Sequence, residues 1–187
     1  MDIRRVIRAC IPLALALGQL LAAEVHANRA DEYRLKTAYL CRFAEFVTWP
    51  ATAPTGTITI GIVSYEPYRA AIDTEFAAVA PEHRPCQVIP ITSPEEARRC
   101  HIVFINSPDR AVLANYLKEL AGVPVLVVTD LKAGARLGAA INFFTVDGKI
   151  RFAINQEAAE QAGLSISSRL LRLGRVVKGG MNDEEPP

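Results

Sequence analysis

Three cysteines beyond the first 27 residues carry thiols that could take part in redox chemistry. They are Cys41, Cys86 and Cys100, while the fourth cysteine, Cys10, lies in a segment that we expect to be removed. In an oxidising compartment, an odd number of thiols predicts one disulfide and one free thiol. We expect the disulfide to join Cys86 and Cys100, because both residues begin predicted strands that could be neighbours. In the alternative interpretation, all three thiols are small buried apolar groups.

Histidines and catalytic motifs are scarce. Beyond the first 27 residues there are two histidines, His83 in a proline-flanked loop and His101 at the start of an apolar strand. His101 is better explained as a structural side chain, and neither histidine belongs to a close cluster of metal ligands. The sequence has no nucleophile elbow, no phosphate-binding loop, no zinc-protease motif and no dinucleotide-binding glycine pattern. We therefore expect a protein that is not an enzyme and uses no metal and no cofactor.

A set of side chains could instead bind a partner or a ligand. The set comprises Trp49, Arg151, Asn155, Ser167, Ser168, Arg169 and Arg172. The tryptophan could project as a docking side chain, and the arginines and Asn155 fit an acidic partner surface or a ligand carboxylate. Each residue also has a plainer interpretation, which we favour. The tryptophan would end a helix against the core, the asparagine and the serines would cap helices, and the arginines would face solvent.

Alternating helices and strands must position these groups. An amphipathic helix begins after Asp31 and ends at Trp49-Pro50, because a residue before proline is disfavoured in a helix. The expected strands cover residues 57–63, 86–91, 101–105 and 123–129. The expected helices run from 64 or 66 to about 79, from 93 as one short helix, and from 107 to about 120. This alternation predicts an α/β protein with a parallel sheet and right-handed crossovers.

The C-terminal part follows a different pattern. Residues 141–146 and 149–154 are strand-like and are separated only by Asp147-Gly148, which predicts a two-residue hairpin. This turn sets Phe143 opposite Phe152 on one largely apolar face, so the sheet gains an antiparallel part. A helix capped by Asn155 or Gln156 follows. The last helix is expected to begin at Ser165 and to carry Arg169, Arg172 and Arg175 three residues apart.

The first 27 residues have the pattern of a secretory signal peptide. Arg4, Arg5 and Arg8 precede an apolar run over residues 9–23. Val25-His26-Ala27 offers a cleavage site, and Leu21-Ala22-Ala23 offers a second one just upstream. The alternative is a buried or anchoring helix, but the run is shorter than the roughly 20 residues of a membrane span. Cleavage would leave equal numbers of basic and acidic residues, which argues against a nucleic-acid partner. The remaining chain predicts one globular domain over residues 28–178 and a flexible tail over 179–187.

Three segments resemble one family in their order along the chain. Residues 36–50 resemble the opening K-x-A-Y-L-x-x-F-x-x-F-x-x-W-P of the YfiR family, also called DUF4154. Residues 100–105 resemble its central C-x-I-L-F-I strand. Residues 141–143, 150–155 and 163–171 resemble its C-terminal signature. The chain departs from the family where Gly138-Ala139-Ala140 replaces a double glycine, and three remaining cysteines cannot form the two disulfides of the family's namesake.

The resemblance implies a fold, a compartment and a partner. Members are periplasmic Rossmann-like or flavodoxin-like three-layer sandwiches. The namesake binds the periplasmic sensor region of an inner-membrane diguanylate cyclase, lowers cyclic-di-GMP and limits biofilm formation, and an outer-membrane lipoprotein relieves this repression. By resemblance we expect such a repressor, with a homodimer compatible with the family. The alternative is a periplasmic small-ligand receptor that acts on a membrane histidine kinase or another sensor.

Overall fold

The structure is a computed structural model that describes residues 31–64, 69–70, 72–74 and 86–180. The predicted signal peptide, His83, most of the helix expected before residue 79 and most of the C-terminal tail lie outside the described residues. Residues 69–70 and 72–74 are helical, and Ile72 is buried in the core.

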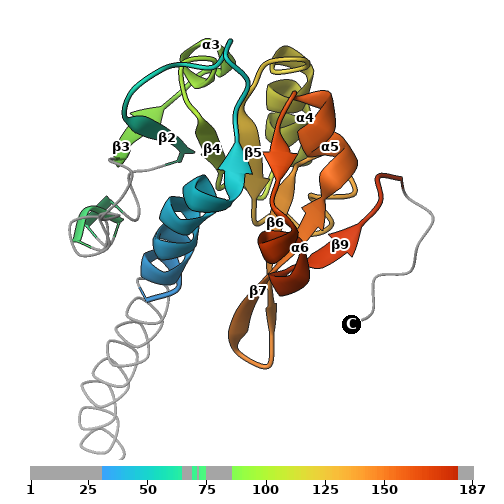
Figure 1. The fold of residues 1–187 in the computed structure, drawn as a ribbon. Helices are drawn as coiled ribbons and strands as arrows, with labels where there is room; N and C mark the ends of the chain where they lie inside the picture. The colour runs from blue at the N-terminus through green and yellow to red at the C-terminus, as the bar shows by residue number, and fades with distance from the viewer. Residues whose placement is uncertain (1–30, 65–68, 71, 75–85, 181–187) are drawn as a thin grey trace, which may run out of the picture.

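A seven-stranded sheet forms the middle of the domain (Figure 1). Along the chain its strands are β2 (Ile58–Val63), β3 (Cys86–Ile91), β4 (Ile102–Ile105), β5 (Leu126–Thr129), β6 (Ile141–Val146), β7 (Lys149–Asn155) and β9 (Arg175–Val177). Their spatial order is β3-β2-β4-β5-β6-β7-β9, and the first five of these run parallel while β7 and β9 run the opposite way. The five parallel strands follow the flavodoxin-like order 2-1-3-4-5. The predicted α/β fold with a mostly parallel sheet is confirmed.

Helices cover both faces of the sheet and make it the middle layer of three. One face packs against the helix over residues 31–46, α5 (Gln156–Gln161) and α6 (Ser168–Leu173). The other face packs against α3 (Pro94–Ala97) and α4 (Arg110–Glu119). Because both faces are covered, every residue of β4 and β5 is apolar or threonine and is buried.

The C-terminal hairpin has the register that its turn predicts. Phe143 pairs with Phe152 across β6 and β7, and Asp147 and Gly148 have φ values of 49° and 70°, as a type I′ turn requires. The rings of these two phenylalanines pack against Phe43 of the first helix, with centroids 5.8 and 5.2 Å away. The hairpin face that was expected to be apolar therefore joins the core.

Because of a short two-stranded sheet, the first helix ends earlier and the last helix begins later than the sequence predicts. The first helix ends at residue 46, not at Trp49, because β1 (Val47–Thr48) pairs with β8 (Ser165–Ile166). For the same reason the last helix begins at Ser168 and not at Ser165. Arg175 lies in β9 and not on that helix, since the helix ends before Gly174. A Cβ at Gly174 would lie 2.6 Å from the Phe152 ring, so the close approach of the chain to Phe152 between α6 and β9 requires glycine.

The predicted disulfide between Cys86 and Cys100 is wrong in this structure. Both strands flank β2, one on each side, so two strand spacings of about 10 Å separate them, which is beyond the reach of a disulfide. The two thiols also belong to opposite faces of the sheet, Cys86 to the face of the first helix and Cys100 to the face of α3 and α4. All three cysteines of the described residues are free thiols.

Candidate functional site

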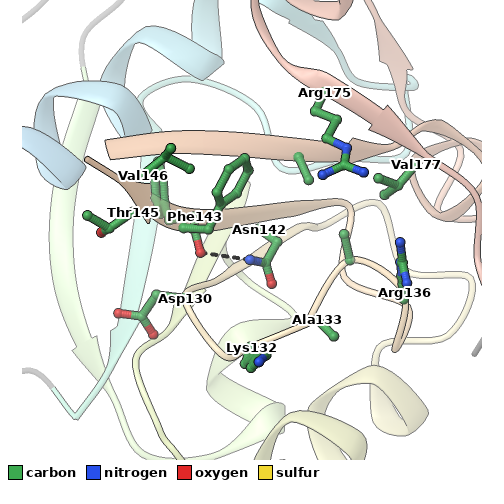
Figure 2. A pocket seen from close by; sticks show the side chains of 13 residues that line it. Asp130, Lys132, Ala133, Arg136, Asn142, Phe143, Thr145, Val146, Arg175 and Val177 are labelled. Atoms are coloured by element: carbon green, nitrogen blue, oxygen red, sulfur yellow. Dashed lines mark hydrogen bonds between the residues drawn. The ribbon is translucent and has the colours of Figure 1, made fainter. Parts of the chain in front are cut away.

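A cavity of about 520 Å³ lies where β6, β7 and β9 meet the loop that follows β5 (Figure 2). Asn142, Ala153 and Arg175 line it from three neighbouring strands, and the sheet register places these three residues in one row. Neighbouring residues of the strands, Phe152 and Ile154, point to the opposite face and into the core. The volume is in the range typical of small-molecule sites.

The loop after β5 is fixed against the sheet by side-chain hydrogen bonds. Thr129 donates its hydroxyl to the Ile105 carbonyl at 2.9 Å and accepts from the Leu131 amide at 3.1 Å. The Asn155 side chain donates from Nδ2 to the Ala135 carbonyl at 2.8 Å. Its Oδ1 accepts from the Ala158 amide at 3.0 Å and so caps α5. The cavity wall is therefore built largely in advance of any ligand.

Gly134 allows the loop to approach the sheet closely. A Cβ at this position would lie 2.3 Å from Thr129 Cγ2 and 2.4 Å from Asn142 Oδ1, where no side chain fits. Asn142 is buried and donates its amide to the Phe143 carbonyl at 2.7 Å. Its Oδ1 has no hydrogen-bond partner among the described residues and faces this glycine.

The cavity wall is positively charged. Lys132, Arg136 and Arg175 line it, and none of the three forms an ion pair with the part of the chain that the structure describes. Among the described residues of the wall, Asp130 is the one carboxylate, and it accepts a hydrogen bond from the Lys36 ammonium at 2.7 Å. Three cations beside an apolar floor suit a small molecule that carries a carboxylate or phosphate group and an apolar part.

Lys36 is a buried lysine that ties the first helix to this wall. It is 4% exposed and contacts Glu32 at 2.6 Å as well as Asp130. Its ammonium also lies 5.0 Å from the centre of the Tyr33 ring, and the Tyr33 hydroxyl donates to Asn106 just after β4. The helix is thus fastened to the carboxyl ends of two parallel strands.

The structure separates the residues that the sequence proposed as a binding set. Ser167 caps α6, while Ser168, Arg169 and Arg172 are exposed on that helix. Arg151 is exposed on β7, and Asn155 is buried beside the cavity loop. Asn155 is the one member of the set whose contacts help to shape the cavity.

Trp49 has a packing role in the structure. Its Nε1 donates to the His101 carbonyl at 3.3 Å, and its ring lies edge-on against the His101 ring. His101 is buried, accepts from the Thr59 amide at Nδ1 and donates from Nε2 to the Pro54 carbonyl. These contacts give both side chains structural functions, and a partner contact of Trp49 stays a prediction.

Sequence reasoning missed most of the cavity wall. The missed wall residues include Asp130, Lys132, Arg136 and Asn142, and Lys36, which contacts Asp130 from behind the wall, was missed as well. The loop cations are spaced along an irregular segment, so no periodic pattern marks them. One signal was available, because Lys36 begins the first family-like segment and lies one turn after Glu32 on the first helix.

Comparison with known proteins assigns the family. The family model described as DUF4154, YfiR/HmsC-like, matches residues 33–175. The chain belongs to the YfiR/HmsC-like family. This family is regulatory and not catalytic, and membership is consistent with a periplasmic regulator of cyclic-di-GMP signalling that acts with a membrane signalling protein.

Other comparisons add little to the family assignment. No curated protein matches this member of the YfiR/HmsC-like family. A solved structure described as the ABC domain in complex with L-Trp from Streptococcus pneumonia is 13% identical, with a TM-score of 0.47. The match covers 64% of this chain and 55% of that one, so it spans about half the length of the solved chain.

The described part of the chain has neither a membrane-crossing helix nor a cluster of metal ligands. No helix among residues 31–64, 69–70, 72–74 and 86–180 is long and apolar enough to cross a membrane. In the same part of the chain, no three histidine, cysteine, aspartate or glutamate side chains group in a way that could hold a metal ion.

Proposed function

We propose that this protein is a periplasmic repressor that binds the periplasmic sensor region of an inner-membrane diguanylate cyclase and lowers cyclic-di-GMP. The observation that carries the proposal is the family match, which extends over residues 33–175 and so includes nearly the whole described domain.

The exposed surface of α6 and β9 is the binding surface that we propose. Arg169 and Arg172 are exposed there, and Leu173 and Val176 are 70% and 52% exposed. Arginine beside exposed apolar side chains is a composition typical of protein interfaces. An acidic patch with apolar side chains at its centre is the complementary surface on the cyclase.

Binding to a purified partner tests this proposal directly. The double variant Arg169→Glu, Arg172→Glu reverses two charges on the α6 surface, and we expect it to bind the periplasmic region of the cyclase at least about tenfold more weakly. Arg110→Glu is the matched control, because Arg110 is exposed at the start of α4 on the other face of the sheet. Equal loss of affinity in both variants would contradict the α6 surface.

Cellular cyclic-di-GMP tests the repression itself. Deleting the gene should raise the cellular level of cyclic-di-GMP, and expression of the unaltered protein should return it to the original level. Unchanged cyclic-di-GMP after deletion, in cells where the cyclase is present, would count against the repressor function even if the purified proteins bind.

The cavity supports a second candidate function, a receptor for a small anionic ligand. Three cationic side chains without ion-pair partners among the described residues line a cavity of about 520 Å³. We expect carboxylate- or phosphate-bearing metabolites to raise the melting temperature, and Arg175→Gln to reduce that shift. Absence of stabilisation by a broad set of polar anions would argue against this function.

A further inference from the structure

Cys41 and Cys86 meet beneath the first helix. Cys86 begins β3 and pairs in register with Ile58 of β2, so both side chains lie on the sheet face that this helix covers. Cys41 lies on the helix, is 0% exposed, and belongs to the same core cluster against which Cys86 packs. Two segments that are 45 positions apart in sequence thus bring their thiols together.

The two thiols are in direct contact and have complementary properties. The Cys86 and Cys41 side chains form a hydrogen bond, and this bond lowers the pKa of the Cys86 thiol. Cys86 is half-buried and can be reached by a reagent, whereas Cys41 is enclosed. A reachable thiol of lowered pKa beside a buried one is the arrangement of an attacking and a resolving cysteine.

Cys100 lacks each of these features. It lies on the opposite face of the sheet and donates its S–H to the Glu96 carbonyl at 3.7 Å. Burial raises the pKa of its thiol to about 11, so it remains protonated near neutral pH. A thiol in this state neither attacks a disulfide nor reaches the other two cysteines.

We propose that Cys41 and Cys86 form a disulfide under oxidising conditions and that Cys100 remains a free thiol. The oxidant is a disulfide-bearing molecule, either a protein or a small compound. The Cys86 thiolate attacks one sulfur of that disulfide and releases the first thiol. The Cys41 sulfur then attacks the Cys86 sulfur of the mixed disulfide and releases the second. Two electrons pass from the protein thiols to the oxidant, and the two protons lost by the protein thiols end on the released thiols.

This bond would fasten the first helix to the edge strand β3. The helix already contacts the middle of the sheet through Lys36 and its aromatic residues, but β3 lies at the edge of the sheet, where β2 is its strand neighbour among the described residues. The inferred link goes beyond the proposed repressor function and does not depend on it.

Mapping of the thiols tests the proposal. The full chain with Cys10→Ser is equilibrated with oxidised glutathione, denatured and titrated, so that every counted thiol lies in the described part of the chain. We expect one reactive thiol per molecule and a linked pair of peptides containing Cys41 and Cys86 that is lighter by two hydrogen atoms. Reduction should lower the melting temperature by about 10 °C, because the bond closes a long loop of the unfolded chain.

Variants of the remaining cysteines separate the alternatives. Cys100→Ser should keep the linked peptides, and Cys86→Ser should abolish them. Three reactive thiols after oxidation, glutathione retained on Cys86 without closure, or a linked peptide that contains Cys100 would each overturn the proposal. If Cys86→Ser does not fold, peptide mapping of the Cys10→Ser protein alone still identifies which cysteines are linked.

Discussion

At the scale of single residues, Lys36 combines deep burial with two acidic partners. Its ammonium lies 2.7 Å from Asp130 and 2.6 Å from Glu32, and its side chain is 5% exposed. A buried ion pair adds little net stability compared with a well-packed apolar pair, but removing one member leaves a charge without compensation. Replacing Lys36 should therefore lower the stability of the whole domain.

We expect Lys36→Met to lower the free energy of unfolding by about 3 kcal/mol, since Asp130 would remain partly buried without its partner. Urea denaturation followed by circular dichroism measures this change. Arg34→Met is the control, because the Arg34–Asp31 pair is 46% and 71% exposed and such pairs contribute little. Similar losses in the two variants would mean that burial of Lys36 has no energetic consequence.

Thiol reactivity should differ sharply between cysteines of the reduced protein. The hydrogen bond from Cys41 lowers the pKa of Cys86, while burial raises the pKa of Cys100 to about 11. The thiolate is the reactive form, so as pH rises iodoacetamide should label Cys86 first. Peptide-resolved mass spectrometry measures the rates. Equal rates at Cys86 and Cys100 in the folded protein would contradict the assignment, and equal rates in urea are the expected control.

At the scale of elements, the loop between β5 and β6 depends on a few close contacts. Gly134 brings it against Thr129 and Asn142, and Asn155 holds it from β7. The cavity exists because this loop is held in place, so changes in the loop should affect stability and ligand binding together.

Gly134→Ala should destabilise the protein by about 2 kcal/mol, because the new Cβ would collide with Thr129 Cγ2 at 2.3 Å. Thermal unfolding measures the effect. Gly179→Ala is a matched control, since a Cβ there would meet the Asn155 amide nitrogen at 3.5 Å, an ordinary contact. A Gly134→Ala protein as stable as the control would show that the loop can move away from the sheet.

Asn155→Ala should cost more stability than Ser167→Ala. Both residues cap a helix, but Asn155 also donates to the Ala135 carbonyl from a buried position. We expect about 1 kcal/mol for loss of the Ser167 cap and about 2 kcal/mol for Asn155, because the Ala135 carbonyl loses its donor. Chemical denaturation of the two variants provides the comparison, and equal losses would rule out the contribution of the bond to Ala135.

Local patterns predicted those elements that are determined by neighbouring residues. The bounds of β3 and the register of the β6–β7 hairpin follow from alternation and from Asp147-Gly148. The start of α6 was misplaced because β8 pairs with β1 more than a hundred residues earlier, and no local pattern reports such a pairing. The wrong disulfide has a similar origin, since the position of β2 between β3 and β4 is a property of the whole sheet.

At the scale of the molecule, stability should be highest in the middle of the sheet. Every residue of β4 and β5 is buried, whereas β9 is a three-residue edge strand with two exposed residues. Amides of β4 and β5 should exchange with solvent only on global unfolding, while those of β9 and the β1–β8 pair should exchange much faster. Hydrogen exchange with mass spectrometry tests this order, and faster exchange in β5 than in β9 would contradict it.

The contact between Lys36 and Asp130 also determines which ligands the cavity can prefer. Asp130 is the one carboxylate among the described residues of the cavity wall, and the lysine of the first helix already neutralises it. An amine entering the cavity would have to compete with a covalently tethered ammonium and would meet Lys132, Arg136 and Arg175 as well. We expect the cavity to bind acids in preference to amines. The Lys36 ammonium belongs to the chain itself, so raising the concentration of an amine ligand does not displace it from Asp130.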